Sequence, residues 1–315
     1  MQLPGSAGVA DTITSSSTPE IGAARPQNKK WRITVVNWLG FVPFLLFCLL
    51  FEVLPAVIII EGSFLDSNTG VLTLNNYQRV VAQASNWHAF QTSISLALVV
   101  AVINAIVGFF AAYGLYHVRI KWIHDIVVAF SSIATNFAGV PLAYAFISTL
   151  GVTGYVTRIL LQWFHVNLYQ TLHFSLYTFW GLVMAYSYFE VPLMILVMLP
   201  ALDALRPQWH EAATSLGASD FTYWRRIALP ILFPSIVSGA MLLFANAFAA
   251  FATAYSLAQG EINLVTILIS FVVAGNVQMD NGLGNALAVG MIIVLLIAFA
   301  LYTTTFRRVS KWQGR

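Results

Sequence analysis

The chain has 315 residues, of which 59% are hydrophobic and only 9% are charged, and its net charge is +3. An average soluble domain has about 45 to 50% apolar and about 25% charged residues, so this composition predicts a membrane protein and excludes a soluble or largely disordered one. The basic residues stand in short clusters between apolar runs, which argues against a nucleic-acid partner, and the single cysteine, Cys48, excludes an intramolecular disulfide or a redox pair.

The N-terminal part of the chain is predicted to be a tail. Residues 1–34 contain small polar residues and prolines, among them Ser15 and Pro26, a composition typical of disorder. The transmembrane domain is expected to occupy residues 35–315. Its first apolar run is too long for the apolar region of a signal peptide, so we interpret it as a retained span.

Six apolar runs are long enough to cross a membrane. A hydrocarbon core about 30 Å thick needs about 20 helical residues. The runs are residues 38–60, 90–116, 123–150, 175–199, 231–256 and 286–306. They are apolar on every face, whereas the strands of a β-barrel alternate in polarity. The predicted fold class is therefore an all-α membrane protein with six transmembrane helices.

The distribution of Lys and Arg predicts the orientation of these spans. Of the 15 basic residues, Arg79 and Arg158 lie on one predicted side and the other 13 lie on the opposite side. Cytoplasmic segments of membrane proteins carry the excess of basic residues. Both termini are therefore predicted to be cytoplasmic.

The cytoplasmic segment 201–230, between the fourth and fifth spans, is predicted to form two short helices. Pro207 suits the first position of a helix, and Gly217 suits its end because glycine adopts a positive φ easily. Asp220 is expected to cap a second helix, and Pro230 to begin the next span.

This segment also contains a motif. Glu-Ala-Ala is followed by three residues, a glycine, nine residues and then Ile-Ala-Leu-Pro. The fixed positions are Glu211, Ala212, Ala213, Gly217, Ile227, Leu229 and Pro230. This pattern resembles the EAA motif of bacterial ABC-transporter permease subunits. The resemblance extends from about Val35 to the C-terminus, and it is strongest to the branch that imports polyamines, iron(III), phosphonates or thiamine.

The resemblance implies a type I importer permease in the bacterial inner membrane. In that family the motif docks on a separate ATP-binding subunit, with Glu211 pairing with a basic group there. ATP and Mg would be bound by that subunit, and the chain itself would need no cofactor. A second permease chain, identical or homologous, and a periplasmic or lipid-anchored solute-binding protein are also implied. The alternative for this segment is a pair of amphipathic helices that rests on lipid headgroups.

The sequence carries no sign of catalysis or of metal binding. It contains no GxxxxGK[ST] phosphate loop, no HExxH pattern and no GxSxG elbow. The six histidines are scattered over loops and span ends. We therefore predict no catalytic residue and no metal ligand, and expect that the chain is not an enzyme by itself.

A few polar residues inside the apolar runs are candidates for the solute path. Glu52 and Glu190 are the only ionisable residues well inside these runs, and a charge at a helix centre costs about 2.5 to 3.5 kcal/mol on insertion scales. Asn136, Tyr186 and Asn246 add further polar atoms. Two glutamates would suit a cationic solute such as a polyamine. Alternatively, Glu52 reaches water at the outer interface, and Glu190 contacts backbone groups freed by Pro192 or another subunit. The other three would make hydrogen bonds between helices.

Two other classes of protein compete with an ATP-driven permease. An ion-coupled secondary transporter or a channel would also place carboxylates in the membrane, and a transporter of that kind often shows an inverted repeat. No such repeat is evident in this sequence. A membrane scaffold without transport activity would tolerate substitutions at Glu211 and Gly217.

Overall fold

The computed structural model describes residues 41–313 except 68, 119, 172–173, 259 and 275–279, and the side chains as far as residue 304. The predicted tail, residues 1–34, and the start of the expected first span lie outside these residues. The described chain is helical, with only an isolated bridge between Leu65 and Leu72. It divides into two compact units, residues 1–55 and 56–315, which we describe separately.

Six helical segments in the described chain are long and apolar enough to cross a membrane. They are Phe41–Ser63, Ala84–Tyr116, Val140–Phe164, Phe179–Asp203, Asp220–Ala249 and Asn281–Thr304. The predicted fold class, all-α with six candidate transmembrane helices, is therefore confirmed.

The first segment contains a widened turn ahead of a proline. It includes the π-helix η1 (Leu49–Val53) and continues as α2 (Leu54–Ser63), where Pro55 lacks the N–H that would bond back along the helix. The N–H of Leu54 instead bonds to the carbonyl of Leu49, five residues back. The same arrangement recurs in η2 (Trp224–Ala228), two residues before Pro230.

The helices after α2 follow one another with short connections. They are α3 (Asn75–Ala82), α4 (Ala84–Tyr116), α5 (Lys121–Asn136), α6 (Val140–Leu150), α7 (Tyr155–Phe164), α8 (Phe179–Asp203), α9 (Pro207–Ser215), α10 (Asp220–Tyr223), η2, α11 (Leu229–Ala249), α12 (Ala252–Ala258), α13 (Val265–Ala274) and α14 (Asn281–Gln313).

Two of the predicted spans are not continuous helices. The expected span 123–150 breaks at Phe137–Gly139 and divides into α5 and α6. Pro141 cannot donate to the carbonyl four residues earlier, and Gly139 has a φ of 76°. The expected span 231–256 breaks after Ala249 and resumes as α12. The prediction of one uninterrupted helix is wrong in both places.

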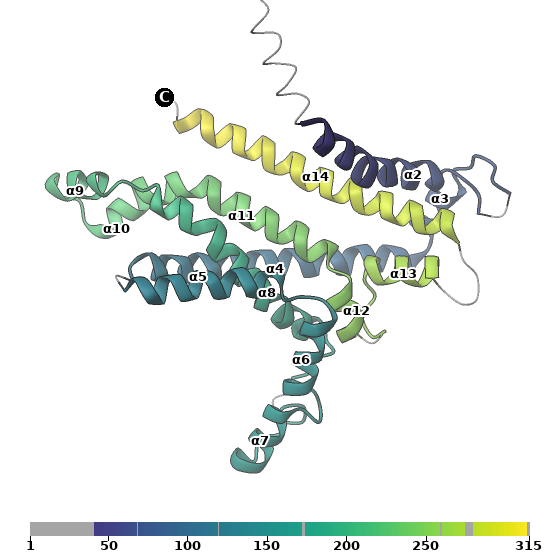
Figure 1. Cartoon of the computed structure of the whole chain (residues 1–315), viewed down its shortest axis with the longest axis horizontal. Helices are drawn as coiled ribbons and strands as arrows, with labels where there is room; N and C mark the ends of the chain where they lie inside the picture. The colour runs from purple at the N-terminus through teal and green to yellow at the C-terminus, as the bar shows by residue number, and fades with distance from the viewer. Residues whose placement is uncertain are drawn as a thin grey trace, which may run out of the picture. The chain divides into compact units, whose positions relative to one another are not determined.

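Helices α4, α8 and α11 pack side by side and form the core of the unit 56–315 (Figure 1). Met194 of α8 is fully buried between glycines of the other two helices. A Cβ atom at Gly108 of α4 would lie 2.5 Å from the Cβ of Met194, and one at Gly239 of α11 would lie 2.6 Å from its Sδ. Small residues thus let these three helices approach closely.

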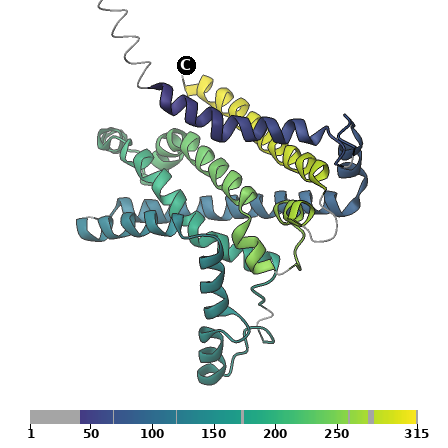
Figure 2. The ribbon, with the colours of Figure 1, turned by 45° about the vertical axis from the view of Figure 1, so that its right-hand side comes forward.

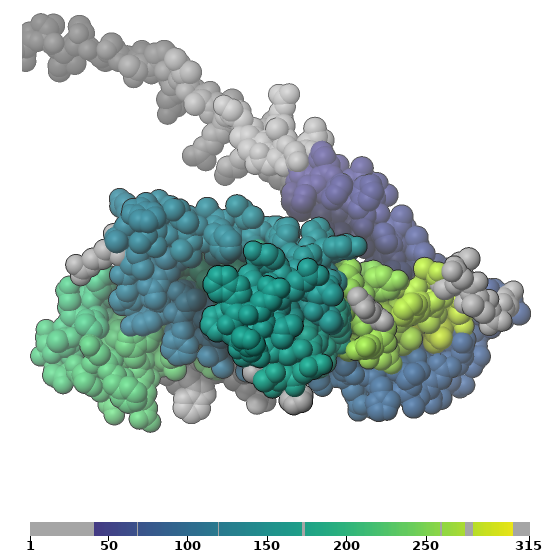
Figure 3. All heavy atoms as spheres, turned by 90° about the horizontal axis from the view of Figure 1, so that it is seen from below, coloured from purple at the N-terminus to yellow at the C-terminus, as the bar shows by residue number. Residues whose placement is uncertain are grey.

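Helices α6 and α7 continue away from this core (Figure 2). In the space-filling view from below, this part of the chain, coloured teal, stands in front of the other helices of its unit (Figure 3). Its side chains Tyr144, Tyr155 and Trp163 are all more than two-thirds exposed.

A polar cluster joins the segment 63–82 to the start of α14. Arg79 of α3 donates to Asp280 at 2.5 Å, and the Ser67 hydroxyl donates to the same carboxylate at 2.7 Å. The N–H of Gly282 in turn donates to the Ser67 hydroxyl at 2.8 Å. These three contacts connect residues more than 200 positions apart in the sequence.

Candidate functional site

The loop that carries the EAA pattern folds into two short helices joined by a tight turn. α9 begins at Pro207, as predicted, and Gly217 follows its end with a φ of 79°. The N–H of Gly217 donates to the carbonyl of Thr214, and the N–H of Ala218 to that of Ala213. These two bonds define a Schellman motif, which requires a left-handed residue at the position of Gly217.

The second helix of the loop is capped by Ser219 rather than by Asp220. The Ser219 hydroxyl accepts from the N–H of Thr222 at 3.3 Å, so the prediction of an Asp220 cap is wrong. Asp220 instead accepts from Nε2 of His210 at 3.0 Å. Serine and aspartate are comparable capping residues, and the serine cap leaves the carboxylate of Asp220 available to contact α9.

The seven residues of the motif have different environments. Glu211, Ala212, Gly217, Leu229 and Pro230 are exposed, whereas Ala213 is buried and Ile227 is half-buried. Ala213 packs with Tyr223 and Leu205 in the core that also contains α8. Ala212, and not Ala213, therefore lies beside Glu211 on the outer face of α9.

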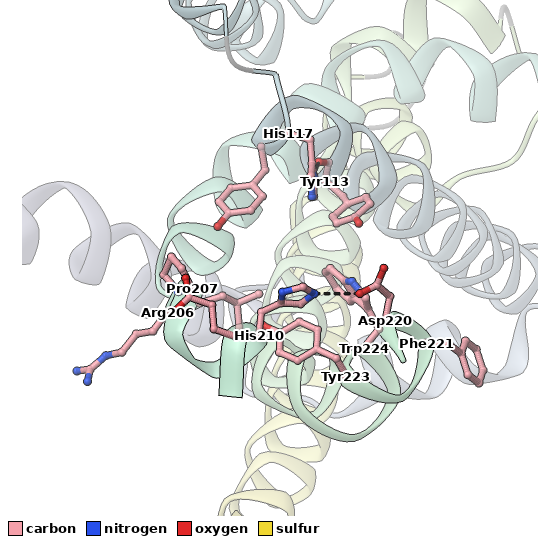
Figure 4. A pocket seen from close by; sticks show the side chains of 12 residues that line it. Tyr113, His117, Arg206, Pro207, His210, Asp220, Phe221, Tyr223 and Trp224 are labelled. Carbon is pink, nitrogen blue, oxygen red and sulfur yellow. Dashed lines mark hydrogen bonds and ion pairs between the residues drawn. The ribbon is translucent and has the colours of Figure 1, made fainter. Parts of the chain in front are cut away.

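A groove of about 900 Å³ separates this loop from the end of α4 (Figure 4). Glu211, His210 and Asp220 contribute to the loop side, and Tyr113 and His117 to the α4 side. Figure 4 shows the contact between His210 and Asp220 as a dashed line across this region. Tyr113 also packs edge-on against Trp224, with ring centroids 4.8 Å apart. The loop thus contacts the C-terminal end of α4, the end that the sequence predicts to be cytoplasmic.

Two of the five candidate path residues contact each other. Nδ2 of Asn246 in α11 donates to Oε1 of Glu190 in α8 at 3.2 Å. Glu190 is 0% exposed, while Asn246 is exposed. The other carboxylate oxygen of Glu190, Oε2, is buried and has no hydrogen-bond partner among the described residues.

The other three candidates do not make this contact. Tyr186 is completely buried, and its hydroxyl donates to the carbonyl of Ala250 at 3.1 Å. Asn136 is exposed, and its amide donates to the carbonyl of Ser132 within α5. Glu52 is exposed in η1 and belongs to the unit 1–55.

A cavity of about 240 Å³ lies where the two broken spans meet. It is lined by residues from both breaks and by Phe189 and Asn246. The hydroxyl of Thr253 in α12 accepts from the N–H of Gly139 at 2.7 Å, which ties the two breaks together. The bond from Tyr186 satisfies the carbonyl of Ala250 at the second break.

Asn104 is a polar residue of the core that the sequence interpretation missed. It is 1% exposed in α4, and both polar atoms of its amide lack a partner among the described residues. Asn104 lies one helical turn before Gly108, and Glu190 lies one turn before Met194, the residue that Gly108 contacts. The register of α4 and α8 thus places Asn104 at the level of Glu190. Its position as an asparagine inside an apolar run is the signal by which the sequence could have identified it.

Comparison with known families identifies the class of protein. Residues 127–311 match the family described as "Binding-protein-dependent transport system inner membrane component". This stretch is more than half of the chain, and the chain belongs to this family. It is therefore a permease subunit of an ABC importer, a multi-pass protein of the bacterial inner membrane, and it has no catalytic activity of its own. The resemblance drawn from the EAA pattern is confirmed.

Relatives with different transported solutes are similarly distant from this chain. The sulfate transport system permease protein CysT of Salmonella typhimurium is 26% identical over 80% of this chain and 88% of its own length. The spermidine/putrescine transport system permease protein PotB of Escherichia coli is 26% identical over 89% and 98%. The trehalose/maltose transport system permease protein MalF of Thermococcus litoralis is 25% identical over 86% and 93%. The polyamine branch is thus one of several that the chain resembles.

The fold matches solved importers. A bacterial ABC transporter involved in the import of the acidic polysaccharide alginate contains a chain that superimposes with a TM-score of 0.68 at 16% identity, over 89% of this chain and 98% of that one. A second structure of a bacterial alginate transporter, in complex with an alginate pentasaccharide-bound periplasmic protein, gives a TM-score of 0.69 with the same coverage.

Proposed function

We propose that residues 201–230 of this permease form the coupling loop, which transmits ATP binding in a separate subunit to the membrane helices. The supporting observation is the Schellman turn at Gly217, whose two backbone hydrogen bonds connect α9 to the start of α10. Glu211 and Ala212 are exposed on α9, while Ala213 anchors the same helix in the core through α8. A force applied at Glu211 would therefore reach α8 through packed side chains.

The rest of the assembly follows from this role. We propose that Glu211, Ala212, Gly217, Leu229 and Pro230 lie at the contact with the ATP-binding subunit, which binds ATP and Mg. Ala213 and Ile227 would support that surface from inside. A solute-binding protein would deliver the solute on the opposite side, and a second permease chain would complete the path.

The orientation is part of the same proposal. Both termini and the segment 201–230 would face the cytoplasm, with residues 1–34 as a tail and 35–315 as the transmembrane domain. Lys121 follows the end of α4, which meets the coupling loop, and Arg225 lies within that loop. Basic residues at these positions fit the cytoplasmic side.

Reconstitution of the complete transporter in proteoliposomes tests the coupling role. We expect Glu211→Ala to reduce ATP-driven uptake at least tenfold while the complex still assembles in the membrane. Glu61→Ala, which removes an exposed glutamate at the far end of the first helix, is the control and should leave uptake unchanged. Uptake that continues without ATP under an ion gradient would contradict the proposal and favour a secondary transporter.

We also propose that the solute is a small cation and that Glu190, Asn246, Tyr186, Asn136 and Glu52 belong to its path. The supporting observation is that Glu190 carries the only carboxylate in α4, α8 up to Leu202, α11 and α12, and that it contacts an exposed asparagine. Competition of uptake by putrescine, sulfate and maltose tests this assignment. Competition by sulfate alone would contradict it.

A further inference from the structure

The cavity between the two helix breaks has the features of a solute-binding subsite. Its volume of about 240 Å³ is bounded by Thr135, Gly139, Phe189, Asn246, Phe251 and Thr253, together with three alanines. These residues come from α5, α8, α11, α12 and the connections at the two breaks. Backbone that leaves the helical conformation within a membrane is tolerated where it is buried in protein or lines a cavity. The two breaks within predicted spans, at Phe137–Gly139 and after Ala249, both lie at this cavity.

The wall of this cavity is polar but uncharged. Among the described residues that line it, none has an ionisable side chain. Two threonine hydroxyls and one carboxamide are its side-chain polar groups, and Phe189 and Phe251 contribute aromatic rings. Each break supplies a helix C-terminus and a helix N-terminus, so their partial charges have opposite signs and do not select a cation or an anion.

The wall of the cavity contacts an acidic side chain, that of Glu190. Its carboxylate lies directly behind Asn246, whose Nδ2 donates to Oε1 at 3.2 Å. Since the amide nitrogen is the donor in this contact, the contact fixes the orientation of the amide. The carbonyl oxygen of Asn246 is therefore directed away from Glu190. It provides an acceptor on an exposed side chain that lines the cavity.

The environment of Glu190 indicates which ligand charge this cavity favours. The side chain is fully buried, and Oε2 has no partner among the described residues. No other ionisable residue lies on α4 between Ala89 and Ala112 or on α11. A positive charge in the cavity would compensate this carboxylate across a medium of low dielectric constant, where charges interact strongly. A negative charge there would be repelled.

We propose that this cavity is a subsite for a protonated amine, with Asn246 as the contact residue and Glu190 as a positioning residue and counter-charge. An alkylammonium group donates hydrogen bonds and carries one positive charge. It would donate to the carbonyl oxygen of Asn246 and to the threonine hydroxyls, while its methylene groups pack against the phenyl rings, whose faces attract cations. The inference rests on the proposed import function and specifies the solute class of that path.

The test measures ligand binding rather than transport. The complete transporter is placed in lipid nanodiscs, and its melting temperature is measured with putrescine dihydrochloride, sodium sulfate or maltose, against sodium chloride of equal ionic strength. We expect putrescine to raise the melting temperature and the other two probes to leave it unchanged. Glu190→Gln retains an oxygen that accepts from Asn246 but removes the charge. It should weaken the apparent affinity for putrescine at least tenfold without lowering the melting temperature of the unliganded complex.

Two further variants make the result unambiguous. Ser187→Ala removes a hydroxyl from the same helix, one that donates to the carbonyl of Val183 within that helix, and should bind putrescine as the wild type does. Asn246→Ala removes the contact directly and should lose the response even if Glu190→Gln fails to fold. A putrescine response that is unchanged in Glu190→Gln or in Asn246→Ala would overturn the proposal, as would a response to none of the probes or a stronger response to sulfate.

ATP hydrolysis in the same preparations separates this inference from the coupling role. Loss of putrescine binding in Glu190→Gln together with normal coupling through Glu211 supports both proposals. An effect of Glu211→Ala on coupling combined with an unchanged putrescine response in Glu190→Gln overturns the subsite alone. Unchanged coupling in Glu211→Ala, combined with loss of putrescine binding in Glu190→Gln, would overturn the coupling role and support the subsite.

Discussion

His210 and Asp220 join the two helices of the loop between α8 and α11: Nε2 of His210 donates to Oδ1 of Asp220 at 3.0 Å. The ring of Tyr223 packs edge-on against the imidazole, with centroids 4.8 Å apart. His210 directly precedes Glu211 in α9, so the pair fixes the position of the motif relative to α10. One polar and one aromatic contact therefore hold α9 against α10, in addition to the backbone bonds of the Schellman turn.

We predict that His210→Ala weakens the link between α9 and α10. The pair is largely exposed, so its contribution to stability is of the order of 0.2 to 1 kcal/mol, and the melting temperature should change little. ATP-driven uptake should fall several-fold because the position of Glu211 is less well defined. His88→Ala, on the N-terminal part of α4, is the control. Uptake equal to that of the wild type would show that the pair does not position the loop.

We predict that Gly217→Ala destabilises the coupling loop. A left-handed conformation costs a residue with a Cβ atom about 1 to 2 kcal/mol, and Gly217 has a φ of 79°. Gly114 is a matched control, because it is helical and a Cβ there would meet nothing within 4 Å. Limited proteolysis of the loop should accelerate in Gly217→Ala and not in Gly114→Ala. Equal proteolysis of the two variants would contradict this account of the turn.

The coupling loop was largely predictable because its signals are local. Pro207 and Gly217 delimit a helix by backbone restrictions that operate within a few residues, and both predictions agree with the structure. The N-cap of α10 was not predictable in the same way. Ser219 and Asp220 are adjacent and similarly good caps. Ser219 is the cap because Asp220 contacts His210, and the position of His210 in space is not evident from the sequence.

We predict that Thr253→Val separates the two helix breaks. The Thr253 hydroxyl is the acceptor for the N–H of Gly139, and Thr253 is almost fully buried. A fully buried N–H left without an acceptor costs about 1 to 3 kcal/mol, and Gly139 is half-buried, so the cost should lie toward the lower end. Thr253→Ser keeps the oxygen and should retain the wild-type melting temperature, whereas Thr253→Val should lower it. Equal melting temperatures of Thr253→Val and Thr253→Ser would show that this hydrogen bond does not stabilise the contact between the two helix breaks.

We predict that the contact between Arg79 and Asp280 makes stability depend on pH in the acidic range. Burial opposes ionisation of Asp280, but hydrogen bonds from Ser67, from the N–H of Leu283 and from Arg79, together with the charge of Arg79, outweigh it and lower the pKa of this carboxyl below its ordinary value of 3.8. The folded state therefore binds this proton less readily than the unfolded state.

The sign of the effect follows directly. The stabilisation, of the order of 1 kcal/mol for a partly exposed pair, is complete above pH 3.8 and is lost as the pH falls through the lower pKa of the folded state. As the pH is lowered from above 3.8, the melting temperature of the wild type should fall. The part of this fall that comes from protonation of Asp280 should be absent in Asp280→Asn. Asp203→Asn, at an exposed aspartate, serves as the control. A profile for Asp280→Asn that parallels the wild type would contradict the assignment.

The spans themselves were predictable, but their breaks and the contacts between them were not. Apolar composition does not distinguish a continuous helix from two helices joined at Phe137–Gly139, since both segments are apolar. Gly139 and Pro141 were the local signals of this break. The contact between Glu190 and Asn246 joins residues 56 positions apart, and it depends on the close approach of α4, α8 and α11 through Gly108 and Gly239. Small residues within a single helix indicate that another helix can approach closely, but they do not identify which helix it is.

Cysteine cross-linking at Glu211 tests the central claim most directly. Cys48 is the only cysteine of the chain, so Cys48→Ser gives a permease chain without thiols. In the complete transporter, Glu211→Cys should form a cross-link to the ATP-binding subunit whose yield changes between nucleotide-free and ATP-bound conditions. Tyr155→Cys, at an exposed position of α7, should form none. A Glu211→Cys variant that reacts only with lipid-soluble reagents and never with an ATP-binding subunit would contradict the account.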